Sequence, residues 1–309
     1  MYLLEAGEGS GVERLPILEK GIAHQLAKGT GGLAVVIEHR YYGKSFPVPD
    51  LSTSNLRFLS TEQALADTAY FARNVVFKGL EHLDLTAPKT PYIAYGGSYS
   101  GAFVAILRKL YPETFWGAIS SSGVTAAVYD FWQYYEAARN YGPPACVRAT
   151  QTLTHIVDNI FLGATPSYSE KLKGVFGLEN VTYNDDFASV LSQGIGGLQG
   201  SNWDPEINEP TFYEYCGNVT SATLLYPATK SLEGTVRELI AAGGYLGQEE
   251  SLVTPFLNYI GYVNVTSVAD CEASGESQDE CFSTHNSTYY AQDDITQTWR
   301  SWPYQYCTQ

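Results

Sequence analysis

A glycine-rich turn between two apolar segments constrains the fold of this chain more than any other feature. Residues 92–106 read YIAYGGSYSGAFVAI, which is an apolar β-prone run, two glycines, Ser98, and then an apolar run of helical character. Small residues at such a junction let a strand and the next helix approach closely, and glycine accepts backbone angles that other residues avoid. The pattern therefore predicts a sharp strand-to-helix turn with Ser98 at its tip.

The same kind of turn presents the nucleophile in α/β-hydrolases, where the hydroxyl is exposed and the following helix directs its dipole at it. The strict G-x-S-x-G pattern is not met, because Ser100 stands where the second glycine would be. A glycine-rich turn that carries a structural serine is the alternative interpretation. These residues alone leave both roles open for Ser98.

Predicted strands and helices alternate around this turn. Residues 1–6 form a short apolar run, and LAVVIE at 33–38 is continuous enough to predict a fully buried strand. Ser60 opens a predicted helix with the capping-box pattern S-T-E-Q, in which Gln63 would reach back to the cap. WGAISSS at 116–122 predicts another buried strand. This order predicts a parallel, doubly wound sheet with its functional site at the carboxyl ends of the strands.

The charge of the chain limits its partners. It has 18 basic and 33 acidic residues and a net charge of −15, which argues against nucleic acid or an anionic membrane as a partner. No apolar run approaches the roughly 18 residues of a membrane span. No C-x-x-C motif or Cys/His cluster indicates a metal, and we expect no cofactor.

Sequons and cysteines indicate the secretory pathway. Four N-x-S/T sequons lie in the second half of the chain, at Asn180, Asn218, Asn264 and Asn286. The five cysteines fit disulfides in an oxidising compartment, and their odd number leaves one without an internal partner. We expect a secreted glycoprotein, with the vacuole or lysosome as the alternative location.

Beyond Ser122 the chain changes character. It continues with helical segments broken by GPP and by loops rich in Gly, Asn and Pro. We interpret residues 124–298 as a mostly helical insertion that caps the carboxyl ends of the strands. It would separate an α/β core at 1–123 from a return to the core at 299–309. The acidic, serine-containing segment 270–294 is expected to be a mobile loop.

Five segments together resemble a known family. They are EHRYYGKSFP (38–47), LSTEQALAD (59–67), YGGSYSGA (95–102), AISSSGV (118–124) and WPYQYCT (302–308). They resemble the prolyl carboxypeptidase and dipeptidyl peptidase II family of serine peptidases, which cleave on the carboxyl side of proline. GGSYSG, DFWQYYEAAR and FGLENVTYNDDFA are similar to fungal secreted members, including acid prolyl endoproteases.

The resemblance runs the length of the chain and implies more than the turn does. It implies an α/β-hydrolase core, a helical cap that helps to build the proline pocket, and peptides or proteins containing proline as substrates. It also implies secretion, or delivery to an acidic compartment, and activity at acid pH.

The resemblance also assigns roles to residues. It makes Ser98 the nucleophile and the backbone N–H of Tyr99 one oxyanion donor. It places the second donor in the loop after the first strand, GEGSG, where Gly7 and Glu8 are the candidates. Glu38 and His39 end a predicted strand, and a satisfied polar corner at the floor of the site is favoured for them over proton transfer.

The rest of the triad is not found in the chain. α/β-Hydrolases order Ser, then Asp or Glu, then His, and the base must reach the serine. After Ser98 the only histidines are His155, in an apolar helical segment, and His285, in a sequon-bearing loop, and neither is favoured as the base. The resemblance places the family's Asp and His on later core strands. We therefore expect both beyond Gln309, a chain truncated at both ends, and no activity of this chain alone.

Two alternatives remain beside a proline-specific peptidase. One is a lipase or carboxylesterase of the same fold, because the fold does not determine the reaction. The other is a non-catalytic α/β-hydrolase homologue that binds a partner through its cap. The sequence leaves endo- or exopeptidase action, disulfide pairing and oligomeric state open.

Overall fold

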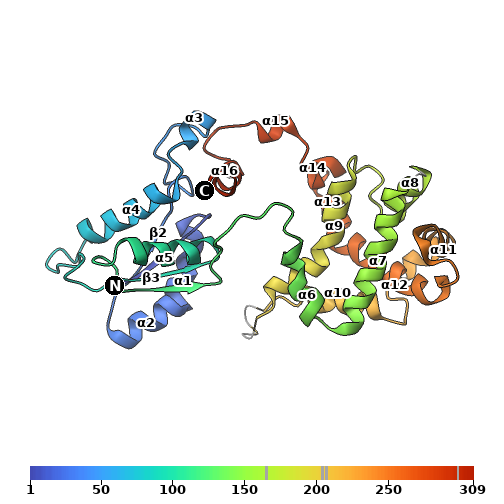
Figure 1. The fold of residues 1–309 in the computed structure, drawn as a ribbon, viewed down its shortest axis with the longest axis horizontal. Coiled ribbons are helices and arrows are strands. Elements are labelled where there is room, and N and C mark those ends of the chain that lie inside the picture. Colours follow the sequence, from blue (N-terminus) through green and yellow to red (C-terminus); the bar gives the residue numbers. More distant parts are fainter. Residues whose placement is uncertain (164–165, 203–204, 206–207, 298) are drawn as a thin grey trace. The chain divides into compact units, whose positions relative to one another are not determined.

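The computed structural model describes residues 1–163, 166–202, 205, 208–297 and 299–309 (Figure 1). These residues form two compact units. The first, the sheet unit, comprises residues 1–129 and 287–309, and the second, the helical unit, comprises residues 130–286. Residue 298, the last of the expected cap, lies outside the described residues.

A four-stranded parallel sheet is the centre of the sheet unit. Its strands are β1 (Tyr2–Glu5), β2 (Ala34–Ile37), β3 (Ile93–Gly97) and β4 (Gly117–Ser121), in the order β2-β1-β3-β4. Leu4 of the inner strand β1 lies opposite Val36 on one side and Tyr95 on the other. The parallel α/β sheet predicted from the alternating elements is confirmed.

Helices connect and cover these strands. They are α1 (Leu15–Lys20), α2 (Ile22–Thr30), α3 (Thr53–Leu56), α4 (Thr61–Asn74), α5 (Tyr99–Leu110), α15 (Ser287–Tyr290) and α16 (Ser301–Thr308). In Figure 1, α4 lies on one side of the strands and α2 on the other. The core includes Leu3 of β1, Leu65 of α4 and Phe103 of α5, all buried.

The start of α4 is confirmed, but its capping box is not. The Ser60 hydroxyl accepts from the Gln63 N–H at 3.3 Å, as the pattern predicts. The Gln63 side chain does not reach back to the cap, because its carbonyl oxygen accepts from the Arg40 guanidinium instead. A charged donor makes a stronger hydrogen bond than the neutral backbone N–H of the cap.

Residues 33–38 and 116–122 contain the predicted strands, but the prediction that these strands are buried is wrong. All four residues of β2 are half-buried, and Ser120 and Ser121 at the end of β4 are exposed. β2 and β4 are the two outer strands of the sheet. An outer strand has a neighbouring strand on one side only, so an apolar run is not sufficient to bury it.

The α-helices of the helical unit follow α5 in the sequence. They are α6 (Glu136–Tyr141), α7 (Pro144–Leu162), α8 (Pro166–Val175), α9 (Asn184–Gly196), α10 (Thr211–Thr220), α11 (Glu233–Ile240), α12 (Glu249–Val263), α13 (Ala269–Ser274) and α14 (Gln278–Phe282). Leu153, Phe176, Phe187 and Phe256 belong to its own core. None of the helices described here is long and apolar enough to cross a membrane.

Two disulfides cross-link the helical unit. Cys146–Cys216 joins α7 to α10, and Cys271–Cys281 joins α13 to α14. Cys307 on α16 is exposed and carries a free thiol. The prediction of disulfides with one cysteine left over is therefore confirmed.

The expectation that 270–294 forms a loop is wrong in secondary structure. The segment contains the end of α13, α14 and α15, and a disulfide closes its first part. Ser277 and Glu280 form a complete capping box at the start of α14. The acidic and serine-rich composition reflects helix starts and solvent exposure, because such residues stabilise the first turn of a helix.

Candidate active site

Ser98 occupies the turn between β3 and α5 in a strained backbone conformation. Its φ of 57° and ψ of −126° lie where residues with a side chain are rarely found. Its N–H donates to the Ser121 carbonyl at 3.0 Å, and its own carbonyl accepts from the N–H groups of Gly101 at 3.0 Å and Val124 at 3.1 Å. The residue is exposed. The predicted strand-to-helix turn is confirmed, with Ser98 at its tip.

Close packing explains the small residues on both sides of Ser98. A Cβ atom at Gly96 would overlap the Ser100 carbonyl, and one at Gly101 would lie 2.5 Å from the Ser121 carbonyl oxygen. Ser100 is buried, and its hydroxyl occupies the space that a side chain on Gly7 would need. Serine can replace the expected glycine at position 100 because the chain has a glycine opposite it.

The predicted oxyanion donors lie around the same turn. Tyr99 is the first residue of α5, so its N–H has no acceptor within the helix and lies at the positive end of the helix dipole. Gly7 follows β1 with a φ of 72°, is buried, and packs against Ser100. Glu8 is half-buried. The structure thus brings the loop after β1 beside the turn, while the donor role of these residues stays a prediction.

A buried hydrogen-bond network lies behind the turn, at the side chain of Tyr99. His39 is 2% exposed, and its Nδ1 lies 2.7 Å from the Arg40 carbonyl oxygen, which can only accept. Nδ1 therefore carries the proton, and Nε2 accepts from the Tyr99 hydroxyl at 3.1 Å. The Gln305 amide donates to the same hydroxyl at 2.9 Å, and its carbonyl accepts from the Tyr42 hydroxyl.

Burial determines the ionisation of this network. It lowers the pKa of His39 to about 4, so the imidazole is neutral above that pH. Burial also raises the pKa of Tyr99 to about 12, and the nearby charges of Glu5 and Glu8 act in the same direction. Both ring nitrogens of His39 are already hydrogen-bonded. The interpretation of His39 as part of a polar corner is supported over a role in proton transfer.

Glu38 holds two loops together. Its carboxylate accepts from the N–H groups of Gly11 at 2.7 Å and Lys44 at 2.8 Å, and from the hydroxyls of Ser45 at 2.8 Å and Ser10 at 3.3 Å. Partial burial alone would raise its pKa, but these four donors together lower it. Glu38 therefore positions the loop after β1, which carries Gly7 and Glu8.

The two histidines that follow Ser98 are both engaged within the helical unit. His155 Nδ1 lies 2.9 Å from the Tyr245 hydroxyl, and His285 Nε2 lies 2.8 Å from Asp185 Oδ2. In the described part of the chain, no imidazole or carboxylate is hydrogen-bonded to the Ser98 hydroxyl. The identity of the general base therefore stays a prediction.

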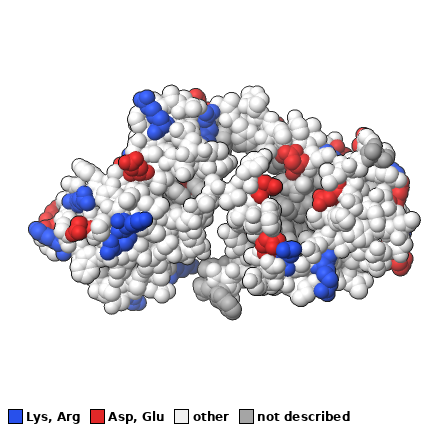
Figure 2. Space-filling view, in the orientation of Figure 1, with Lys and Arg blue, Asp and Glu red and all other residues white. Residues whose placement is uncertain are grey.

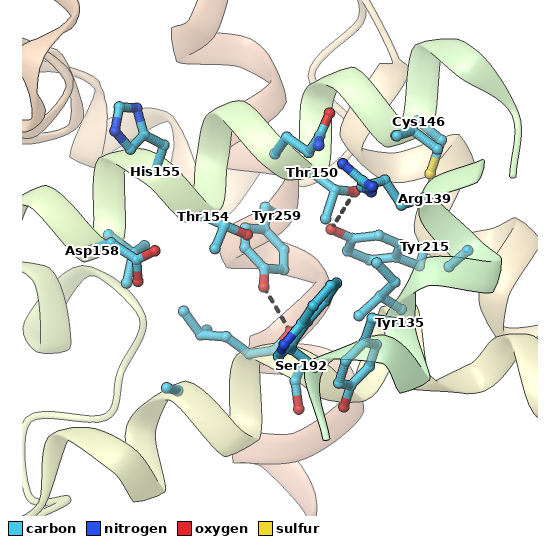
Figure 3. A pocket seen from close by; sticks show the side chains of 18 of the residues that line it. Tyr135, Arg139, Cys146, Thr150, Thr154, His155, Asp158, Ser192, Tyr215 and Tyr259 are labelled. Atoms are coloured by element: carbon cyan, nitrogen blue, oxygen red, sulfur yellow. Dashed lines mark hydrogen bonds between the residues drawn. The ribbon is translucent and has the colours of Figure 1, made fainter. Parts of the chain in front are cut away.

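The helical unit contains a cavity of about 570 Å³ that sequence reasoning did not find (Figure 3). Apolar and aromatic side chains of α6, α7, α9, α10 and α12 line most of it. Hydrogen bonds fix two of its rings: the Tyr215 hydroxyl pairs with Thr150 at 2.9 Å, and the Tyr259 hydroxyl donates to the Leu191 carbonyl at 2.7 Å. Figure 2 shows acidic side chains at the edge of a hollow in this unit. Such a cavity suits an apolar ligand.

A second cavity, of about 600 Å³, lies in the sheet unit. The loop after β1 lines one part of it through Glu8 and Ser10, and Tyr42, Lys44 and Phe46 line another. Neither cavity could be read from a local pattern, because each is formed by residues that are distant in the sequence.

The four sequons differ in their surroundings. Asn180 and Asn286 are exposed outside the helices. Asn218 lies in α10, and its side-chain amide donates to the Glu214 carbonyl at 2.8 Å. Asn264 directly follows α12, and its amide donates to the Ile260 carbonyl at 2.9 Å. Glycosylation at each of the four stays a prediction.

Comparison with known proteins decides the family. The model of the serine carboxypeptidase S28 family matches residues 2–220. The chain belongs to this family. The S28 chain is 48% identical over 310 residues to a probable extracellular serine carboxypeptidase of Arthroderma benhamiae, covering 100% of this chain and 43% of that protein.

Other relatives are also named as serine proteases. Serine protease vicPa of Bipolaris victoriae is 30% identical over 301 residues, which cover 94% of this chain and 53% of that protein. The human thymus-specific serine protease is 37% identical over 115 residues, covering 37% of this chain and 21% of that protein. The S28 chain spans about half the length of the curated relatives it matches most fully.

These findings confirm the resemblance to a serine peptidase family and the α/β-hydrolase fold with many added helices. The expected secreted location is also confirmed. The relative from Arthroderma benhamiae is named as extracellular, and the two disulfides of the helical unit fit an oxidising compartment.

Proposed function

We propose that the protein containing this chain is a secreted serine peptidase that cleaves peptides or proteins on the carboxyl side of proline. The observation that carries the proposal is Ser98, a strained and exposed serine on a strand-to-helix turn. Such strain persists only where the surrounding structure fixes it, and it is found at functional sites. Membership of the serine carboxypeptidase S28 family supports the same role.

The geometry suggests the course of the reaction. The Ser98 hydroxyl attacks the carbonyl carbon of the scissile bond, and its proton passes through a base to the leaving amine. The Tyr99 N–H and a donor from the loop after β1, at Gly7 or Glu8, bind the oxyanion. Water then hydrolyses the acyl-enzyme and releases Ser98.

We place the catalytic acid and base outside these 309 residues. His39 is buried with both ring nitrogens bonded, and His155 and His285 pair with Tyr245 and Asp185. A base must be able to reach the serine hydroxyl, and none of these three imidazoles is bonded to it.

Proline suits recognition by shape. Its ring fixes φ and its nitrogen carries no hydrogen, so a pocket can select it with few hydrogen bonds. We assign the formation of this pocket to the inserted segment 124–298, in the role of a cap over the core formed by 1–123 and 299–309. The apolar, aromatic character of the cavity in the helical unit supports a role of this segment in binding.

Fluorophosphonate labelling tests the nucleophile in the full-length secreted protein. Ser98→Ala should abolish labelling and lower kcat/KM for a prolyl chromogenic peptide by at least about 10³-fold. Ser54→Ala removes an exposed serine of α3 and should leave both the labelling and kcat/KM unchanged. Labelling that persists in Ser98→Ala would refute the assignment.

A parallel assay with a short-chain ester separates the alternatives. Cleavage after proline is the expected result for the unmodified protein. Strong ester turnover without cleavage after proline would favour a lipase or carboxylesterase. No labelling and no turnover would favour a non-catalytic homologue that acts by binding.

A further inference from the structure

Two acidic residues and a histidine meet in the helical unit. Asp185 and Asp186 lie in the first turn of α9, and His285 lies between α14 and the end of the unit at Asn286. One carboxylate oxygen of each aspartate and a ring nitrogen of His285 all lie within 4.8 Å of one another. The aspartates and the histidine come from segments about 100 residues apart.

Asp186 has an unsatisfied oxygen at this cluster. The residue is only 2% exposed. Its Oδ1 accepts from the N–H of Thr284 at 3.0 Å and from the Thr284 hydroxyl at 3.2 Å. Its Oδ2 is buried and has no hydrogen-bond partner among the described residues. A buried carboxylate oxygen without a partner is costly, so the site calls for a further positive or donating group.

The imidazole is held in place beside the carboxylates. His285 Nε2 lies 2.8 Å from Asp185 Oδ2. Its ring stacks on Tyr183, with the centroids 3.8 Å apart and the planes at 16°. Stacking fixes the plane of the ring, and the exposed side chain of Asp185 remains free to adjust.

The surrounding charges leave the cluster negative. Asp279 is a third nearby carboxylate whose charge acts on His285. Lys173 is the basic residue facing the group, but its ammonium donates to the carbonyls of Val181 at 2.9 Å and Thr182 at 3.1 Å. Within the described residues, no side-chain ammonium or guanidinium is therefore paired with Asp185 or Asp186.

We propose that Asp185, Asp186 and His285 bind a divalent transition-metal ion of the zinc type. Two carboxylate oxygens and one imidazole nitrogen are ligands that Zn²⁺ accepts in a four-coordinate site, with water in the fourth position. Ca²⁺ takes six to eight oxygen ligands and no nitrogen in its usual protein sites, so this set favours zinc over calcium. The ion supplies the missing partner of Asp186 and replaces the contact between Asp185 and His285.

The ion would have a structural effect. It would join the start of α9 to residues 283–286, where Thr284 already binds Asp186. Binding to the folded state alone raises stability, and the gain grows with the ratio of free ion to its dissociation constant. The site is independent of the peptidase proposal, because it includes none of the residues assigned to the reaction.

Calorimetric titration of the chelator-treated full chain with ZnCl₂ at pH 7 tests this site. We expect one ion per chain, and affinity at least about tenfold lower in Asp186→Asn, His285→Gln and Asp185→Asn. Asp185 is exposed, so its variant should stay folded even if Asp186→Asn does not. Asp270→Asn removes an exposed acid of α13 and should bind as the unmodified chain does.

Thermal unfolding gives a second readout. Zn²⁺ should raise the melting temperature of the unmodified chain and of Asp270→Asn, but not that of Asp185→Asn. Affinity should fall at pH 5, because zinc needs a neutral imidazole. The proposal is overturned if Zn²⁺ does not bind to the unmodified chain. It is also overturned if Asp185→Asn and His285→Gln bind Zn²⁺ as tightly as the unmodified chain does, or if the unmodified chain binds Ca²⁺ as tightly as Zn²⁺.

Discussion

At the scale of single residues, the strain at Ser98 depends on neighbours that leave room for it. Gly96 and Gly97 both precede Ser98, but only Gly96 faces an obstacle. A Cβ atom there would overlap the backbone carbonyl of Ser100, whereas the nearest atom to a Cβ at Gly97 is the Ser121 carbonyl oxygen at 3.9 Å. Packing therefore requires glycine at position 96, whereas it leaves room for a small side chain at position 97.

We expect Gly96→Ala to lower the free energy of unfolding by about 2–3 kcal/mol, since backbone cannot move aside as a side chain can. Gly97→Ala should change it by no more than about 0.5 kcal/mol. Urea unfolding followed by circular dichroism measures both. Equal losses in the two variants would contradict the packing explanation.

Glu5 and His39 make stability depend on pH in opposite directions. Burial raises the pKa of Glu5 to about 8 from its usual 4.5, so the folded state keeps a proton that the unfolded chain loses between these values. Stability then falls as pH rises, by about 1.4 kcal/mol per pH unit. His39, with its pKa lowered to about 4 from 6.5, makes stability rise with pH between those values. The two slopes oppose each other between 4.5 and 6.5. Above 6.5 Glu5 makes stability fall with pH, and His285, whose pKa is raised by its hydrogen bond to Asp185, acts in the same direction.

Stability of the unmodified chain should therefore fall between pH 6.5 and 8, and Glu5→Gln should make this fall smaller by the part that Glu5 contributes. Glutamine is neutral and similar in size, and it can keep a contact with Thr68, whose hydroxyl lies 3.3 Å from Glu5. Glu62→Gln replaces an exposed glutamate of α4 and should keep the fall. Urea midpoints at four pH values provide the measurement. A fall of the same size in Glu5→Gln would refute this origin.

The conformation and contacts of a single residue could be predicted from the sequence where they depend on residues nearby in the chain. The turn at Ser98 and the cap at Ser60 each depend on neighbours within a few positions. The bond from Gln305 to Tyr99 spans 206 residues, and no local pattern indicates it. Gln63 was misassigned for the same reason, because its partner Arg40 comes from another part of the chain.

At the scale of elements, α16 is tied to the start of α5. Gln305 is 1% exposed and connects the hydroxyls of Tyr99 and Tyr42. The ring of Trp302 packs edge-on against Tyr99, with the centroids 5.5 Å apart. The segment WPYQYCT therefore supports the turn that carries Ser98 from behind.

Gln305→Leu should lower the free energy of unfolding by about 1–3 kcal/mol, because it leaves the buried Tyr42 hydroxyl without its partner and removes one of the two hydrogen bonds of the Tyr99 hydroxyl. Cys307→Ala changes an exposed residue of the same helix and should have an effect below about 0.5 kcal/mol. Urea unfolding compares them. If Gln305→Leu is as stable as Cys307→Ala, the network contributes nothing to the fold.

Element type was easier to predict from the sequence than burial. The alternation of apolar runs and helix starts predicted parallel strands, because period and length are visible in a single segment. Whether a strand is inner or outer depends on the order in the sheet, so β2 and β4 were misjudged. The acidic segment 270–294 was misjudged because its disulfide and capping box stabilise short helices that composition alone does not indicate.

At the scale of the whole molecule, covalent cross-links are unevenly distributed. Both disulfides lie in the helical unit, and the described part of the sheet unit has none. Cys146–Cys216 closes a loop of 70 residues and Cys271–Cys281 one of 10. Each disulfide lowers the conformational entropy of the unfolded chain by closing its loop, which stabilises the folded state by about 4 kcal/mol for the longer loop and about 3 kcal/mol for the shorter one. The helical unit therefore depends on oxidation and the sheet unit does not.

Hydrogen exchange of the Cys146→Ala/Cys216→Ala double variant tests this difference. Exchange should accelerate in α7 and α10, the two helices that the bond joins, and stay unchanged in β1, β3 and α5. The sheet unit thus provides a control within the same molecule. Acceleration of equal size in both units would show that they do not unfold separately.

The position of β1 in the sheet affects how the chain folds during its synthesis on the ribosome. β1 is an inner strand, yet it precedes both of its partners, residues 34–37 and 93–95, in the sequence. At about 5–20 residues per second, the ribosome needs roughly 5–20 s to deliver β3 after β1. During this interval an apolar strand with an unpaired edge can associate with other nascent chains. In each round of synthesis, the strand is therefore exposed to such association for several seconds.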